Sequence, residues 1–177
     1  VNGVKDVVGN VSKTDFTDDY YAKDLINGIG KTTLDGTPID KGNIYALDGT
    51  RGFTVSGEIN TTQTNAEIAR QDGAFTVGID GDGYLTFNFN GMSVNSKHTE
   101  KTRQNDGSVT ESVEGRIADG KKHQFAAVKE ENGMIKLYMD GELVNSTYDA
   151  SKVNPNVSKG NLVFGDGLTG DVEYVTL

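Results

Sequence analysis

Apolar and polar residues alternate in several short segments of this 177-residue chain. The segments are residues 53–59, 74–80, 84–90 and 133–140, and their apolar positions are Phe53, Val55, Ile59, Phe75, Val77, Ile79, Leu85, Phe87, Phe89, Ile135, Leu137 and Met139. Successive side chains of a strand point to opposite faces, so each segment has one face suited to a core. The pattern is typical of antiparallel strands and predicts an all-β fold.

Asp-Gly steps punctuate these segments, occurring nine times along the chain. Asp-Gly suits the positive φ angles of tight hairpin turns, and short strands at this spacing predict a two-sheet antiparallel sandwich or a barrel. The polar residues 92–117 indicate a long hairpin or protruding loop that turns at Asp106-Gly107. Residues 14–28 indicate one short N-terminal helix, with a capping residue at the start and Asn27-Gly28 as the stop.

Composition narrows the possible functions. The formal charge of −9 argues against nucleic-acid binding and against docking on an anionic membrane. No apolar run approaches the roughly 20 residues of a membrane span. The chain has no Cys, which excludes disulfides and thiolate metal sites. Its first residue is Val, which favours a processed product or a module of a longer protein. We expect a single domain over residues 1–177, with the core sandwich in 44–177 and a less regular N-terminal segment in 1–43.

Residues 119–146, "DGKKHQFAAVKEENGMIKLYMDGELVNS", resemble a hallmark of the LamG-like, concanavalin A-like jelly rolls. In those domains a run of the type D-G-K-W-H-x-V-A leads through a turn into L-Y-V-D-G. Residues 53–91 are similar to the family's earlier strands and residues 161–177 to its closing strand, so the resemblance covers residues 44–177. It implies a jelly-roll β-sandwich. Lys122 stands where the family usually has Trp, which removes one favoured sugar-stacking residue.

This fold carries lectins, carbohydrate-binding modules, adhesion domains and some hydrolases, so function must be argued from residues. The related laminarinase-like hydrolases carry E-x-D-x-x-E, and the nearest approach here is Glu111 with Glu114. A spacing of three puts these two on opposite faces of a strand, where they cannot act as a pair. His98 and His123 have neither triad-like nor metal-like spacing. The sequence therefore predicts that the domain is not an enzyme.

The polar strand faces carry groups that suit a sugar. The candidate carbohydrate-binding residues are Tyr84, Asn88, Asn90, Tyr138, Arg70 and Arg116. Tyr offers an apolar ring and a hydroxyl, and Asn offers both donors and acceptors. Arg70 ends a half-buried strand, whereas Arg103 and Arg116 flank the long hairpin and suit an acidic sugar through bidentate contacts. The alternative for each of these residues is an ordinary solvated sheet face.

A Ca²⁺ site is a further expectation, because many relatives bind this ion near a sheet edge. Loop carboxylates and carbonyls can supply the oxygens that Ca²⁺ requires. Asp48 and Asp171 are the candidate ligands, since the closing strand of such sandwiches often lies beside an early one. The alternative is that the Asp-Gly steps serve as turns and nothing more.

Together these features favour a non-catalytic carbohydrate-binding, lectin-like or adhesion module of a secreted or surface-attached microbial protein. Its partners would be glycans or glycoconjugates, with neighbouring domains or subunits as further partners, at an extracellular, cell-surface or virion-surface location. The alternative is a structural or protein-interaction jelly roll that decorates a surface, fibre or virion and has no sugar ligand.

Overall fold

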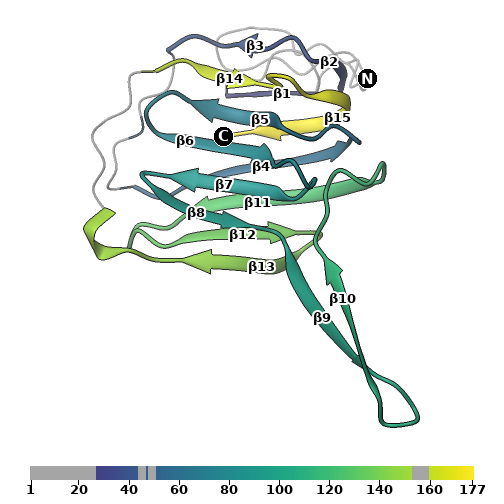
Figure 1. Cartoon of the computed structure of the whole chain (residues 1–177). Coiled ribbons are helices and arrows are strands. Elements are labelled where there is room, and N and C mark those ends of the chain that lie inside the picture. The colour runs from purple at the N-terminus through teal and green to yellow at the C-terminus, as the bar shows by residue number, and fades with distance from the viewer. Residues whose placement is uncertain (1–26, 44–46, 48–50, 153–159) are drawn as a thin grey trace, which may run out of the picture.

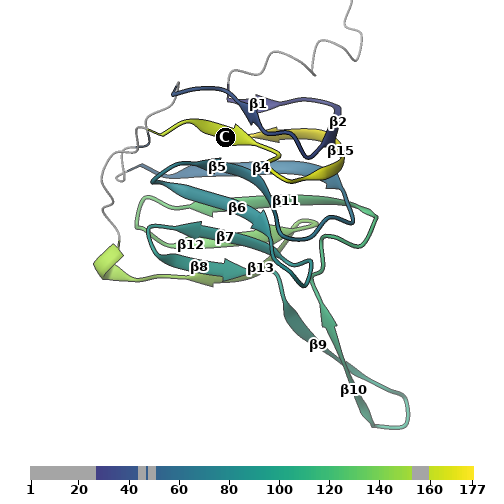
Figure 2. The ribbon, with the colours of Figure 1, turned by 45° about the horizontal axis from the view of Figure 1, so that its top comes forward.

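A computed structural model describes residues 27–43, 47, 51–152 and 160–177. Two antiparallel sheets pack face to face, and a two-stranded ribbon projects from them (Figures 1 and 2). The strands are β1 (Gly28–Ile29), β2 (Thr32–Asp35), β3 (Ile39–Asp40), β4 (Phe53–Asn60), β5 (Ala66–Gln71), β6 (Phe75–Ile79), β7 (Leu85–Phe89), β8 (Met92–Asn95), β9 (His98–Arg103), β10 (Val109–Glu114), β11 (Lys122–Lys129), β12 (Ile135–Met139), β13 (Glu142–Thr147), β14 (Leu162–Phe164) and β15 (Thr169–Thr176). Within the described ranges, Ala150–Lys152 forms a short 3₁₀ turn and no helix is long and apolar enough to cross a membrane.

The strand order confirms the predicted two-sheet jelly-roll sandwich. One sheet runs β1-β15-β4-β11-β12-β13, with β2 also paired to β15, and the other runs β3-β14-β5-β6-β7-β8. Residues 28–40 lie outside the predicted core sandwich of residues 44–177. They nevertheless supply β1 and β2 to the first sheet and β3 to the second. The predicted N-terminal helix falls almost entirely on residues 14–26, which lie outside the described residues.

The predicted inward faces of the strands form the core. The buried members are Val55, Ile59, Phe75, Val77, Ile79, Leu85, Phe87, Phe89, Ile135, Leu137 and Met139. Phe53 on β4 is half-buried, and its ring centroid lies 5.3 Å from that of Phe75 and 5.5 Å from that of Phe89 on the opposite sheet. Burial of each such side chain stabilises the fold by about 1.5–3 kcal/mol. Alternation within the strands therefore creates the apolar interface that holds the two sheets together.

The closing strand departs from strict alternation. A β-bulge lies between Val172 and Tyr174 in β15, so that Val172 and Val175 are both buried although they are three residues apart. The extra residue leaves Glu173 and Tyr174 on the solvent side. A bulge places two residues opposite one on the neighbouring strand, which is how both side chains reach the outer face.

Candidate functional site

Three predicted sugar-binding residues lie along the outer side of the six-stranded sheet. Arg70 on β5 is the cross-strand partner of Thr76 on β6, and Thr76 is the partner of Asn88 on β7. Asn90 occupies the β7–β8 turn with a φ of 46°, and its side-chain amide donates to the Lys152 carbonyl at 2.8 Å. Asn88 is exposed and available to a ligand, whereas the amide of Asn90 already fixes the turn to the neighbouring loop.

Arg70 is held by carboxylates on three sides. Its guanidinium donates to Glu67 at 2.9 Å, to Asp72 at 3.0 Å and to Asp166 at 2.9 Å. Burial alone would lower the pKa of Arg70, but the hydrogen bond to Asp72 and the charge of Glu67 outweigh it and raise that pKa. These contacts tie β5 to the loop before β15, so Arg70 stabilises the fold and has little capacity left for an acidic sugar.

Tyr84 and Arg116 lie at the opposite end of β7, where the two residues form an isolated β-bridge. The Lys97 ammonium lies 5.2 Å from the centre of the half-buried Tyr84 ring. Arg116 Nε donates to the Ala118 carbonyl at 3.3 Å. Tyr84 and Arg116 are therefore neighbours, but they are separated from Asn90 by the full length of β7.

Tyr138 lies on the other sheet. It points outward from β12, because Leu137 and Met139 on either side of it face the core. Tyr138 and Tyr84 consequently lie on opposite outer faces of the sandwich and cannot converge on one ligand. The six predicted sugar-binding residues are thus divided among at least three places.

The outer face of the seven-stranded sheet brings together a different set. Cross-strand pairing places Thr176, Ser56, Ala126, Tyr138 and Leu143 in one row from β15 to β13. Tyr174, which is 37% exposed, begins the adjoining row opposite Glu58. We call the surface formed by Tyr174, Ser56, Ala126 and Tyr138 the tyrosine strip.

Small side chains separate the two rings of the tyrosine strip. Tyr174 on β15 and Tyr138 on β12 are three strands apart, which corresponds to about 14 Å. Ser56 and Ala126 lie on the intervening strands in the row of Tyr138, and both are partly exposed. The row of Tyr174 continues instead through Glu58 and Gln124, so the strip has an aromatic residue toward each side with two small residues and two polar residues between them. Tyr174 was not among the predicted residues, because its outward direction depends on the bulge.

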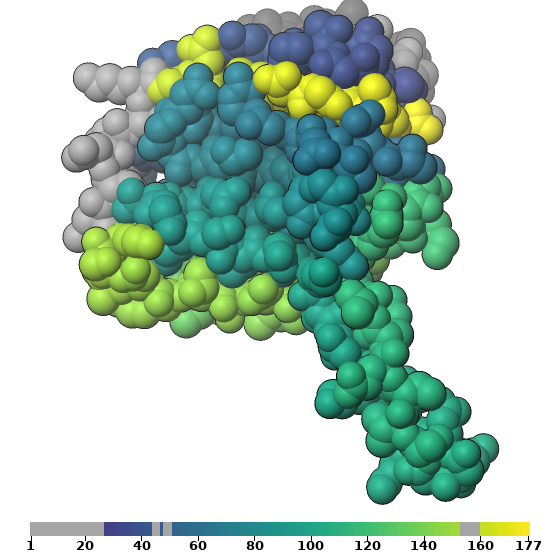
Figure 3. Space-filling model, in the orientation of Figure 1, coloured from purple at the N-terminus to yellow at the C-terminus, as the bar shows by residue number. Residues whose placement is uncertain are grey.

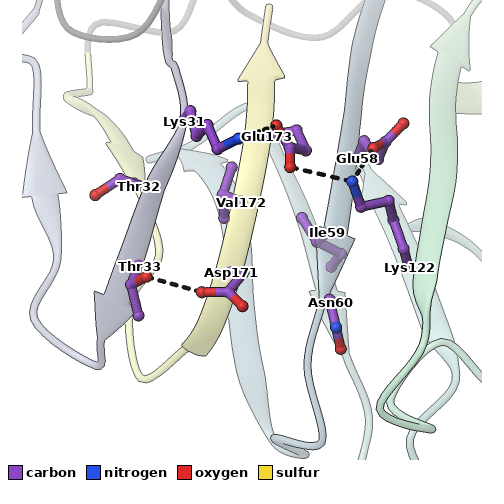
Figure 4. Close-up of a pocket in the computed structure, with 10 residues that line it drawn as sticks. All are labelled: Lys31, Thr32, Thr33, Glu58, Ile59, Asn60, Lys122, Asp171, Val172 and Glu173. Carbon is purple, nitrogen blue, oxygen red and sulfur yellow. Dashed lines mark hydrogen bonds and ion pairs between the residues drawn. The ribbon is translucent and has the colours of Figure 1, made fainter. Parts of the chain in front are cut away.

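A charged pocket of about 330 Å³ adjoins the strip on the same face (Figure 4). Strands β2, β15, β4 and β11 line it, together with Lys31 just before β2. The lining residues are Lys31, Thr32, Thr33, Glu58, Ile59, Asn60, Lys122, Asp171, Val172 and Glu173. The Lys122 ammonium lies 3.0 Å from both Glu58 and Glu173, and Lys31 lies 3.6 Å from Glu173. Lys122 thus lies between the carboxylates of Glu58 and Glu173, so hydrogen-bond donors and acceptors are close together in the pocket.

The two glutamates of this pocket do not have the raised pKa that the acid of a glycoside hydrolase requires. The hydrogen bond from Gln124 at 2.8 Å, followed by that from Lys122, lowers the pKa of Glu58 below its usual 4.5. The hydrogen bond from Lys122 likewise lowers the pKa of Glu173. A glycosidase needs one carboxylic acid whose pKa is raised so that it can protonate the leaving group. The hydrogen bonds in this pocket lower the pKa of both Glu58 and Glu173, which is the opposite of what that acid requires.

The predicted metal ligands are only partly within the described residues. Asp171 accepts a hydrogen bond from the Thr33 hydroxyl at 2.7 Å, and β15 pairs with the early strands β2 and β4 as the prediction required. Asp48 lies outside the described residues. Across the ranges that the structure describes, no group of three or more His, Asp or Glu side chains could hold a metal ion.

Several Asp-Gly steps serve as turns. The carboxylate of the Asp accepts a hydrogen bond from the backbone N–H two residues later at Asp35, Asp80, Asp106 and Asp119. Asp140-Gly141 has φ angles of 51° and 87°, as a type I′ hairpin turn requires. These contacts support the interpretation of Asp-Gly as turn chemistry at those positions.

Glu111 and Glu114, which the sequence predicts cannot act as a catalytic pair, lie on the projecting ribbon. Glu111 faces Lys101 across the ribbon at 2.6 Å, whereas Glu114 is the cross-strand partner of His98. Their partners belong to opposite faces, so Glu111 and Glu114 do not face a common ligand. His123 is placed differently: its ring nitrogens lie 2.7 Å from Asp140 and 3.0 Å from Asp119, between two loops.

The chain belongs to the concanavalin A-like lectin/glucanases superfamily, because the laminin G family model of that superfamily matches residues 35–175. Among solved structures, domains LG4-5 of the mouse laminin alpha1 chain are 16% identical, with a TM-score of 0.51 over 82% of this chain and 39% of that chain. A mutant of HCR/D is 16% identical, with a TM-score of 0.50 over 85% of this chain and 38% of that chain.

Galectin LEC-6 of Caenorhabditis elegans is 12% identical, with a TM-score of 0.44 over 83% of this chain and 94% of that chain. No curated protein sequence matches the chain. The chain spans well under half the length of the laminin and HCR/D structures that it resembles. At these identities the laminin and HCR/D structures show a common fold and no more, and the ligand must be argued from the surface itself.

Proposed function

We propose that this domain is a non-catalytic carbohydrate-binding module and that the tyrosine strip with the adjoining charged pocket is its binding face. The observation that carries the proposal is the placement of Tyr138 and Tyr174 in adjoining rows of one outer sheet face, with Ser56 and Ala126 on the strands between them. Aromatic rings stack on the apolar faces of sugars, and the polar groups of the pocket can bind hydroxyl groups. Membership of a superfamily that includes lectins supports the same conclusion.

The ligand that fits is an extended glycan, since the two rings are separated by about 14 Å across the sheet. A shallow open face of this kind gives weak affinity per site, and repetition of sites would supply avidity. The module would hold a secreted or surface-attached microbial protein to a glycan-bearing surface. Ca²⁺ at Asp171 with Asp48 remains part of this proposal.

The test is a glycan array followed by calorimetric titration with soluble oligosaccharides, in Ca²⁺ and then in chelator. We expect Tyr138→Ala with Tyr174→Ala to abolish binding and Tyr84→Ala, on the opposite sheet, to leave binding unchanged. The reverse pattern would move the site to the six-stranded sheet. Wild-type protein that binds no glycan in either condition would overturn the proposal. Loss of thermal stability in chelator would support the metal site independently of any sugar.

A further inference from the structure

The ribbon formed by β9 and β10 extends away from the sandwich (Figures 1 and 3). We call residues 97–114 the arm. Its residues are exposed, except for His98 at the base, which is partly buried. An isolated two-stranded hairpin is marginally stable in water, so a projection of this length needs support from the body or from a partner.

The base of the arm is fixed firmly to the body. Ser96 is fully buried, and its hydroxyl accepts a hydrogen bond from the Leu85 N–H at 2.9 Å and donates to the Gly115 carbonyl at 2.5 Å. Gly115 has a φ of 94°, and a Cβ at this position would lie 1.9 Å from the Ser96 carbonyl oxygen. The two strands therefore leave the sandwich in a defined direction, which is what a docking element requires.

The two faces of the arm differ in chemistry. One face carries Thr99, Lys101, Arg103, Val109, Glu111 and Val113, and the other carries His98, Glu100, Thr102, Thr110, Ser112 and Glu114. Val109 and Val113 are each 56% exposed, and no second layer covers them within the described part of the chain. The first face therefore combines two exposed valines with a net positive charge, and we call it the valine face. The second face is hydroxyl-rich and acidic.

Exposed hydrophobic side chains also lie at the two ends of β13 on the body of the same chain. Leu143 near the start of β13 is 52% exposed, and Tyr148 just after its end is 51% exposed. Glu142 precedes Leu143, and neither Glu142 nor Arg103 of the valine face has an ion-pair partner among the described residues. Across the ranges that the structure describes, the exposed large hydrophobic side chains are Val109, Val113, Leu143, Tyr148 and Tyr174. Four of these five thus lie on the valine face or on this patch.

The base of the arm meets the body beside Glu142, the first residue of β13. A pocket of about 400 Å³ lies there, lined by His98, Val113 and Glu114 from the arm and by Met139, Glu142 and Val144 from the body. Charged side chains follow both edges of the arm, which disfavours addition of another strand to those edges. Contact through the valine face is therefore favoured over edge pairing.

We propose that a second copy of this chain covers these surfaces, with the valine face of each arm packed on the Leu143–Tyr148 patch of the other copy. Such an exchange is reciprocal and closes with two-fold symmetry. It buries the four exposed hydrophobic side chains of each copy and brings Arg103 of one copy toward Glu142 of the other. The inference goes beyond carbohydrate binding, although Leu143 is the cross-strand partner of Tyr138, so the arm of the second copy would lie beside the tyrosine strip.

Sedimentation equilibrium of the complete chain in about 0.15 M salt, where surface charges more than about 8 Å apart are screened, tests the proposal. We expect a concentration-dependent dimer, with Val109→Lys plus Val113→Lys weakening dimerisation at least about tenfold. Thr102→Lys plus Ser112→Lys adds the same charge to the other face and should leave the dimer intact. A chain that remains monomeric at every concentration, or a dimer that resists the valine substitutions, would overturn the proposal.

Charge reversal tests the contact itself. Arg103→Glu alone and Glu142→Arg alone should each weaken the dimer, and the two together should restore it. Circular dichroism and thermal unfolding of each variant separate loss of association from loss of folding. Failure of the double variant to recover would exclude this pairing of surfaces, even if the chain dimerises by another route.

Discussion

The sandwich body and the arm are built from the same local pattern, yet only one of them has a core. In β7 the alternate residues Leu85, Phe87 and Phe89 are all buried between the sheets. In β10 the alternate residues Val109 and Val113 face solvent, and Glu111 between them bonds to Lys101. Alternation therefore specifies a strand with two unlike faces, while burial depends on a second layer. In the body that layer is supplied by the chain itself.

This contrast predicts that the free energy of unfolding resides in the body. Phe87→Ala should reduce it by about 3–5 kcal/mol, because Phe87 is fully buried and packs edge-on against Phe53 at 6.2 Å. Thr86→Ala on the outer face of the same strand should cost less than about 0.5 kcal/mol. Urea unfolding of both variants measures the difference. Equal losses would show that the interface between the sheets is not the main source of stability.

The junction between body and arm should show the next largest effect. Gly115→Ala introduces a Cβ against the Ser96 carbonyl at a positive φ, and should cost at least roughly 2 kcal/mol. Gly107 at the arm tip also has a positive φ, but a Cβ added there would meet no described atom within 4 Å, so Gly107→Ala should cost less. Hydrogen exchange should show loss of protection spreading into β8 for the first variant only. Identical exchange in the two variants would contradict a rigid base.

A smaller, pH-dependent effect is expected near the same junction. Burial alone would lower the pKa of His123, but hydrogen bonds to Asp140 and Asp119 outweigh it and raise the pKa above the ordinary 6.5. Lys121 lies 3.3 Å from Asp119 and shares that carboxylate. The stabilising contribution of His123 is therefore complete below pH 6.5 and is lost as the pH rises through the raised pKa.

Thermal unfolding between about pH 6 and about pH 9 measures this contribution. The wild-type melting temperature should fall over that range by more than that of His123→Gln, which cannot carry the charge. A His98→Gln variant serves as the comparison, since that ring bonds to the Ser96 carbonyl and lies 3.8 Å from one carboxylate, that of Glu100, rather than bonding to two. Parallel pH curves for the wild type and His123→Gln would rule out a stabilising charged contact of His123 with Asp140 and Asp119.

The smallest expected effect is that of a Val→Thr change on the arm, and its comparison with the same change in the body separates the two regions most directly. Val77→Thr in the body buries a hydroxyl in the core and should cost about 1–3 kcal/mol. Val109→Thr makes the same chemical change on the arm and should alter the stability of the monomer by less than about 0.5 kcal/mol. Chemical unfolding at low protein concentration measures both. A large loss for Val109→Thr in the monomer would mean that the arm packs on its own body.

The difference between body and arm also explains what the sequence could predict. Period-two alternation identified the strands of the body and their buried faces, including Phe87 and Leu137, because burial acts on each strand locally. The polar composition of residues 92–117 and the Asp106-Gly107 step located the projecting hairpin. Alternation cannot state which sheet a strand joins, because that depends on strand order over the whole chain. Tyr84 and Tyr138 therefore looked equivalent in sequence and lie on opposite faces of the molecule.

The bulge in β15 has a consequence for how such surfaces change over generations. Val172 and Val175 are both in the core although two residues, instead of one, separate them, because the bulge accommodates the extra residue. Loss of a single codon at position 173 or 174 would return the strand to regular pleating without moving either valine. Gain or loss of an outward ring is thus uncoupled from the hydrophobic interior, and a lineage could acquire or discard a contact surface while its fold stays intact.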